Sequence, residues 1–236
     1  FHSTSDRILR RSGQHIGITP QFVIFDTSDT KSLINQIIKS LSIDGKKNSP
    51  AAIAATISSA KSELIAPLKY KNFARTPFQE VVAQVYPLYQ KRLHEQNALD
   101  FDDLLGEATR LFNEAPQVLK QYQTRWQYLL VDEYQDTNRA QYVLSKLLAG
   151  EAQNIFAVGD MSQAIYSFRG ADFRNILNFE RDYPEAKIYR LEQNYRSTPQ
   201  ILEAATAVIS QNNTHISLNL VAMSEKMVFA LTGFSW

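Results

Sequence analysis

The chain has 236 residues, 44% hydrophobic and 21% charged, a balance typical of a globular protein with a sizeable core. It has no cysteine, which excludes disulfides and thiolate metal ligands, and its four histidines are scattered without the spacing of a zinc site. The formal net charge of +1 does not indicate a nucleic-acid binder, so any such binding must depend on particular residues.

From about Thr27 to Phe112 the chain has the hydrophobic spacing of helices. Apolar residues recur on one helical face from Leu33 to Leu41. Ser49-Pro50 and Thr76-Pro77 each pair a capping residue with a proline suited to the first helical position, so helices should begin at these prolines. We therefore predict an all-helical subdomain over residues 27–98.

After residue 127 the pattern changes to short apolar runs, separated by helical stretches near residues 138–149 and 172–181. Strand–helix–strand alternation of this kind predicts an α/β fold with one parallel sheet covered on both faces. Polar residues directly follow each predicted strand, and ligands bind at the carboxyl ends of strands in such sheets, so we expect one site there. The predicted strands are Tyr128–Val131, Asn154–Val158 and Lys187–Leu191.

Two adjacent acids, Asp132 and Glu133, follow the first of these strands. Mg²⁺ prefers oxygen ligands and combines a carboxylate with phosphate oxygens and water, which suits Asp132 as the metal ligand. Glu133 is placed to orient and deprotonate a water that attacks a phosphate. By itself the pair could instead be two surface acids at a solvated strand end, so the prediction depends on the longer string around it.

That string, Asp-Glu-x-Gln-Asp-x-Asn from Asp132 to Asn138, resembles the Walker B motif of the UvrD/Rep/PcrA-type helicases of superfamily 1. Further segments, up to about residue 219, are similar to family motifs and stand in the family's order. The resemblance implies a RecA-like (P-loop NTPase) motor domain with a parallel sheet and an all-helical insertion. The similar segments are Phe1–Ser3, Leu99–Leu105, Val158–Ala171 and Leu191–Thr198.

The segment Val158–Ala171 resembles the family motif that couples ATP to DNA. The resemblance implies that Gln163, an uncharged donor and acceptor, senses the terminal phosphate. Phe168 stands where the family stacks a base, with Tyr166 and Arg169 beside it, and single-strand binders use such aromatic faces and cations. The alternatives are core packing for Tyr166 and Phe168, and an ion pair within the site for Arg169.

The segment Leu191–Thr198 opens the second motor domain in the family. There the resemblance implies that Tyr195 offers a flat face to adenine. Arg196 would act as an arginine finger that neutralises charge on the transferred phosphoryl group. A surface arginine before a helix start is the alternative. Phe1 and His2 match the end of a family motif that lines the path of single-stranded DNA.

The chain departs from the family pattern at three points. Ser162 and Ala164 replace an acid and a serine of the coupling motif, and the tail from about residue 224 is atypical. A Walker A loop is absent, since residues 45–47 do not match Gly-x-x-x-x-Gly-Lys-Ser/Thr. We therefore expect an internal fragment that is inactive alone. Residues 1–26 and 99–186 would belong to the first motor domain, 27–98 to the helical insertion and 187–236 to the start of the second motor domain.

These features predict a fragment of an ATP-dependent DNA helicase that uses ATP and Mg²⁺ to move along single-stranded DNA, 3′ to 5′, and to unwind duplex DNA. We expect a monomer, with repair or replication proteins as partners. No apolar run approaches the roughly 18 residues of a membrane span, so we expect a cytoplasmic protein without membrane contact. Two alternatives stay open: a non-catalytic single-stranded-DNA-binding fragment, and the motor portion of a helicase–nuclease.

Overall fold

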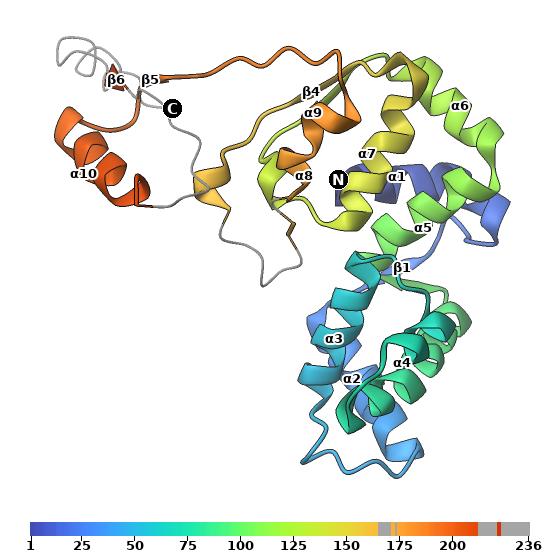
Figure 1. Ribbon diagram of the computed structural model, residues 1–236. Helices are drawn as coiled ribbons and strands as arrows, with labels where there is room; N and C mark the ends of the chain where they lie inside the picture. Colours follow the sequence, from blue (N-terminus) through green and yellow to red (C-terminus); the bar gives the residue numbers. More distant parts are fainter. Residues whose placement is uncertain (165–170, 173, 212–220, 223–236) are drawn as a thin grey trace, which may run out of the picture.

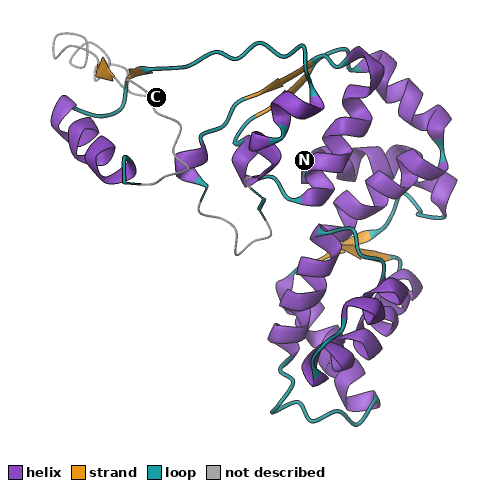
Figure 2. Cartoon of the chain, in the orientation of Figure 1, coloured by secondary structure: helices purple, strands orange, loops and turns teal. Residues whose placement is uncertain are grey.

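The structure is a computed structural model that describes residues 1–164, 171–172, 174–211 and 221–222 (Figure 1). Most of its regular structure is helical, and each described strand has three residues or fewer (Figure 2). Up to residue 125 the elements are α1 (His2–Ser12), the 3-10 helix η1 (Gly13–Ile16), β1 (Val23–Phe25), α2 (Thr27–Ser40), α3 (Pro50–Ser62), η2 (Pro67–Phe73), α4 (Pro77–Glu95), β2 (Ala98–Asp100), α5 (Phe101–Glu114) and α6 (Pro116–Arg125). The later elements are β3 (Leu129–Val131), η3 (Tyr134–Asp136), α7 (Arg139–Ala149), η4 (Gly150–Ala152), β4 (Ile155–Ala157), η5 (Met161–Gln163), α8 (Arg174–Leu177), α9 (Phe179–Asp182), β5 (Gln193–Asn194), α10 (Pro199–Ile209) and β6 (Val221–Ala222).

Helices α2, α3 and α4 pack around a hydrophobic cluster of their own and form a helical arm that projects downward in Figure 1. Both predicted proline starts are confirmed. The Ser49 hydroxyl accepts from the Ala52 N–H and the Thr76 hydroxyl from the Gln79 N–H, each at 3.2 Å, so a side chain satisfies one free N–H at each helix start. The predicted apolar face of α2 is buried here, and the innermost residues of the arm include Ile34, Ile37, Ile53, Val82, Val85 and Tyr89.

A second hydrophobic cluster joins α1, α5, α6 and α7, which form the body beside the arm (Figure 1). The predicted helix at residues 138–149 is confirmed as α7, whose N-terminus is capped by Asn138 through a 2.9 Å bond from the Gln141 N–H. The stretch predicted near 172–181 forms two short helices, α8 and α9, on either side of Asn178. Buried residues that hold the body together include Ile8, Leu9, Leu105, Ala108, Leu111 and Phe112.

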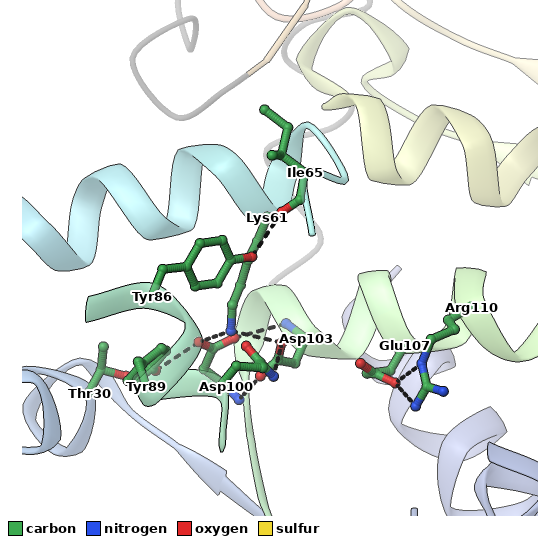
Figure 3. A network of polar contacts seen from close by, with 10 residues as sticks. Thr30, Lys61, Ile65, Tyr86, Tyr89, Asp100, Asp103, Glu107 and Arg110 are labelled. Carbon is green, nitrogen blue, oxygen red and sulfur yellow. Dashed lines mark hydrogen bonds and ion pairs between the residues drawn. The ribbon is translucent and has the colours of Figure 1, made fainter. Parts of the chain in front are cut away.

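A buried ionic network joins the arm to the body (Figure 3). The Lys61 ammonium on α3 lies 2.6 Å from Asp100 Oδ2 and 2.8 Å from Asp103 Oδ1 at the start of α5, and all three side chains are buried. The Tyr89 hydroxyl donates to Asp100 at 2.8 Å. Burial opposes ionisation of Asp100, but the Lys61 ammonium keeps its pKa below the usual range. Burial raises the pKa of Asp103 to about 7, and the neighbouring Asp100 carboxylate adds to this rise, whereas the Lys61 ammonium opposes it.

The described strands form three separate parallel pairs, so the prediction of parallel pairing is confirmed and that of one continuous sheet is wrong. Strands β3 and β4 pair in the register Leu129↔Ile155 to Val131↔Ala157. Strands β1 and β2 pair where the arm meets the body, and β5 pairs with β6. The β1–β2 pair was not predicted.

The predicted strand Lys187–Leu191 is also wrong. Among the described residues it has no strand partner, and Ile188 and Leu191 are 62% and 74% exposed. A strand needs a neighbour that satisfies its backbone groups and a layer that covers its apolar side chains, and the part of the chain that the structure describes supplies neither to this segment. The described residues also leave Leu130 and Phe156 of the β3–β4 pair 73% and 58% exposed, so they do not form the predicted cover on both sheet faces there.

Candidate functional site

The chain turns sharply after β3, and this turn presents Asp132 and Glu133 at the carboxyl end of the β3–β4 pair. Glu133 has a φ of 51°, in the left-handed region that non-glycine residues rarely adopt. Three hydrogen bonds hold the turn: Glu133 N–H to Asp132 Oδ1 (2.9 Å), Tyr134 N–H to the Val158 carbonyl (2.9 Å) and Val158 N–H to the Val131 carbonyl (2.8 Å). Such local strain, of order 1–3 kcal/mol, tends to occur at functional sites.

A buried amide, that of Gln135, connects the end of β3 to the end of β4. The residue is 1% exposed. Its Nε2 donates to Glu133 Oε2 at 2.8 Å, and its Oε1 accepts from the Asp160 N–H at 3.0 Å. A longer contact of 3.4 Å runs from Nε2 to Asp136. The partners set the orientation of the amide, because a carboxylate only accepts and a backbone N–H only donates.

Gln163 lies at the end of η5, the turn that follows β4. Its Nε2 donates to Asp160 Oδ2 at 3.0 Å, and the other oxygen of Asp160 accepts from the Ser162 N–H at 2.8 Å. The Gln163 side chain is exposed to solvent. The carboxylate pair and Gln163, 30 residues apart in sequence, therefore belong to one hydrogen-bonded cluster at one edge of the strand pair.

Tyr195 and Arg196 lie elsewhere, in the turn between β5 and α10. Asn194 Oδ1 shapes that turn by accepting from the N–H groups of Arg196 (2.9 Å) and Ser197 (2.8 Å). Both predicted side chains are exposed, and within the described ranges no hydrogen bond or ion pair joins either one to the carboxylate cluster. Figure 1 shows α10 at the far end of a long connection from α9. The structure thus brings together Asp132, Glu133 and Gln163 but not Tyr195 or Arg196.

The residues predicted to contact DNA lie partly within the described chain. His2, at the start of α1, packs edge-on against Phe101 with ring centroids 6.3 Å apart. Burial lowers the pKa of His2, so its imidazole is neutral at pH 7. Phe1 is half-buried against the hydrophobic cluster of the body. The other predicted contacts lie outside the described residues: Tyr166, Phe168 and Arg169.

Comparison with known proteins identifies the family to which the chain belongs. A model of the UvrD/REP helicase N-terminal domain matches residues 1–184. The chain belongs to the UvrD/REP helicase family. It is similar to the ATP-dependent DNA helicase PcrA of Bacillus subtilis (strain 168), with 51% identity over 220 residues, 93% of this chain. It is also 48% identical over 220 residues, again 93% of the chain, to the PcrA of Leuconostoc citreum, and 50% identical over 213 residues, 90% of the chain, to that of Staphylococcus aureus (strain Mu50 / ATCC 700699).

This member of the UvrD/REP helicase family spans about 30% of the length of the curated relatives that it matches, namely 30% of the first and 29% of the other two. These relatives are named ATP-dependent DNA helicase PcrA, which implies that they use ATP and bind DNA. The resemblance read from the motifs is confirmed by these matches. None of the helices within the described ranges is long and apolar enough to cross a membrane.

The cluster of this UvrD/REP helicase chain fits a magnesium ion that is held mainly by a nucleotide. Asp132 is exposed; its Oδ1 accepts from the Glu133 N–H, and within the described residues no hydrogen bond engages its Oδ2. Mg²⁺ retains several waters and takes one or two carboxylates plus phosphate oxygens, so a single free carboxylate oxygen is a suitable protein ligand. Among the described residues no group of three His, Cys, Asp or Glu side chains could hold a metal without a nucleotide.

The part that Gln135 plays in the cluster was not predicted from the sequence. The residue lies within the string that resembles Walker B. Its polar neighbours belong to the same string, so the sequence gives no reason to single out Gln135. What distinguishes Gln135 is its burial and its contact with Asp160, 25 residues further along the chain. Neither property can be read from local sequence, because both depend on the pairing of β3 with β4.

Proposed function

We propose that this chain supplies part of the motor of an ATP-dependent DNA helicase that moves 3′ to 5′ on single-stranded DNA and unwinds duplexes. Family membership and the names of the relatives support the reaction class. The observation on which the proposal depends is the hydrogen-bonded cluster that gathers Asp132, Glu133 and Gln163 at the carboxyl ends of β3 and β4. Ligands bind at that end of parallel strands.

In the proposed reaction Glu133 is the general base. It accepts a proton from a water whose oxygen attacks the terminal phosphorus of ATP, while the bond from that phosphorus to the ADP oxygen breaks. Asp132 is the protein ligand of Mg²⁺, which supplies positive charge to the phosphate oxygens when bound. Gln163 hydrogen-bonds the terminal phosphate. Because Gln163 also donates to Asp160, loss of that phosphate changes the hydrogen bonding of the turn after β4.

The remaining predicted residues act when two parts of the motor close on the nucleotide. Arg196 then neutralises charge on the transferred phosphoryl group and Tyr195 stacks on adenine. We assign residues 1–26 and 99–186 to the first, RecA-like motor domain, 27–98 to a helical insertion and 187–236 to the start of the second domain. The DNA-contacting residues of this arrangement are Phe1, His2, Tyr166, Phe168 and Arg169.

A chimera tests the proposal. The segment of Bacillus subtilis PcrA that aligns with this chain over 220 residues is replaced by the corresponding part of this chain. We expect the chimera to hydrolyse ATP and to do so faster when single-stranded DNA is added. A Glu133→Gln variant of the chimera should lose about 10²–10⁴-fold in kcat, because the amide cannot take the proton. Glu151→Gln, the same change at an exposed acid in η4, is the control and should keep the rate.

Two results would contradict the proposal: a folded chimera without DNA-stimulated ATPase, or full activity in the Glu133→Gln variant. The alternative of a purely DNA-binding fragment is tested on this chain by itself. Fluorescence anisotropy with a labelled single-stranded oligonucleotide then measures affinity with and without ATP. Tight binding by the chain, combined with an inactive chimera, would favour the binding fragment over the motor.

A further inference from the structure

We propose that Gln135 is a positioning residue that holds the general base Glu133 and the phosphate-sensing turn after β4 in one fixed arrangement. This inference rests on the proposed ATP hydrolysis. Gln135 does not touch the nucleotide in this proposal. It acts through Glu133 on one side and through Asp160 on the other.

The chemistry of the position requires an amide. Its nitrogen faces the Glu133 carboxylate at 2.8 Å and its oxygen faces the Asp160 N–H at 3.0 Å, so the side chain must donate on one side and accept on the other. Glutamate would keep the acceptor but place an oxygen against the Glu133 carboxylate. Methionine has a similar length and offers neither bond. Both changes therefore remove the donor to the Glu133 carboxylate, and methionine also removes the acceptor for the Asp160 N–H.

Glu133 depends on this contact for its orientation. Its backbone is in the left-handed region and its side chain is exposed, so the local chain does not confine the carboxylate. Within the described residues, Gln135 Nε2 is the hydrogen-bond donor to that carboxylate. Displacement of a catalytic group by about 1 Å can reduce a rate about 10²-fold, so this one bond can decide the rate of proton transfer.

The other end of Gln135 is held tightly as well. A Cβ on Gly159 would lie 2.8 Å from Gln135 Oε1 and 3.3 Å from the Gln135 backbone nitrogen, so a side chain at position 159 would have to displace the Gln135 amide. The same turn carries Asp160, which accepts from Gln163. Gln135 thus stands between the group that removes the proton and the group that senses the terminal phosphate, and a shift at either is transmitted to the other.

The geometry can be tested on the 236-residue chain by urea unfolding. We expect Gln135→Glu to lower the urea midpoint, because two carboxylates then face each other. The double variant Glu133→Gln/Gln135→Glu should recover most of that loss, because the amide introduced at position 133 can donate to the carboxylate introduced at position 135. Gln141→Glu is the matched control, since the Gln141 oxygen only accepts there, from the Asn138 N–H at 2.8 Å. No recovery in the double variant would overturn the proposed contact.

The role in catalysis is tested in the chimera with Gln135→Glu and with Gln135→Met. We expect kcat to fall about 10- to 100-fold, as for other residues that orient a reacting group through a hydrogen bond, while KM for ATP is unchanged. Gln141→Glu should leave both constants unchanged. An active chimera in which both Gln135 variants keep the parental kcat refutes the positioning role but leaves the proposed function intact. An inactive chimera would count against the proposed function, whereas the unfolding experiment still decides whether the contact exists.

Discussion

Replacement of Lys61 by methionine is the sharpest test of how the arm is held to the body. The change keeps the length of the side chain but removes the charge between Asp100 and Asp103. In the structure that charge makes hydrogen bonds of 2.6 and 2.8 Å to two buried carboxyls. Each such charge-assisted bond contributes about 1.5–3 kcal/mol. Since the buried ammonium also has a desolvation cost that methionine lacks, we expect a net loss of about 3–5 kcal/mol in the free energy of unfolding at pH 8.

The loss should depend on pH in a predictable direction. Without Lys61 the pKa of both carboxyls rises in the folded chain, that of Asp103 from the value of about 7 that it already has. Between that raised pKa and the unfolded value of about 4, the folded chain binds protons that the unfolded chain does not, so stability rises as pH falls through this window. In the Lys61→Met variant both carboxyls bind protons in this way and stabilise the folded chain as the pH falls. The difference between Lys61→Met and the parent chain should therefore shrink from pH 8 to pH 5.

Urea unfolding followed by circular dichroism at the two pH values measures both effects. The control is Lys91→Met, the same substitution at an exposed ion pair with Glu95 at 3.7 Å, which should cost less than about 1 kcal/mol. Equal losses for the two variants at pH 8 would refute the account of the buried network. So would a loss for Lys61→Met that is the same at pH 5 as at pH 8, because the unpaired carboxyls are then not the cause.

Three further substitutions test local packing by the same unfolding assay. Gly159→Ala should lower the free energy of unfolding by about 1–3 kcal/mol, because the new Cβ would lie 2.8 Å from both Gln135 Oε1 and Ile176 Cδ1. Gly106→Ala, in open space inside helix α5, should instead raise it by about 0.5–1 kcal/mol, and equal signs for the two would contradict the close approach. Tyr134→Phe should raise it by about 1 kcal/mol, because the Tyr134 hydroxyl is buried without a hydrogen-bond partner among the described residues; a clear loss would show that the hydroxyl has one.

The elements that the sequence predicted correctly are those whose cause is local. Ser49 and Thr76 cap helices because a hydroxyl reaches an N–H three residues on, and a proline follows at the position where no N–H is needed. The apolar face of α2 was visible because residues three and four apart lie on one side of a helix. The family motifs were visible for a similar reason, since each is a short string of neighbouring residues.

The strand pairing and the hydrogen bonds of the site could not be predicted in the same way. Apolar strings near residues 130 and 188 look alike in sequence, yet among the described residues only the first has a strand partner. Which segments pair depends on the rest of the folded chain. The gathering of Asp132, Glu133 and Gln163 at one edge was expected, and the structure places them together; their roles stay predictions. The convergence of Arg196 on the same cluster was also expected, but the structure holds it apart.

Neighbouring residues in the chain were enough to predict the helices of the arm, the order of the motifs and the resemblance to the UvrD/REP helicase family. The burial of Gln135 between Glu133 and Asp160, and of Lys61 between Asp100 and Asp103, became visible in the folded chain. The physical reason is the range of the interactions. A cap or a helical face arises among residues a few positions apart, whereas burial of an amide or a charge depends on partners 25 and 39 positions away, which only the folded chain brings into contact.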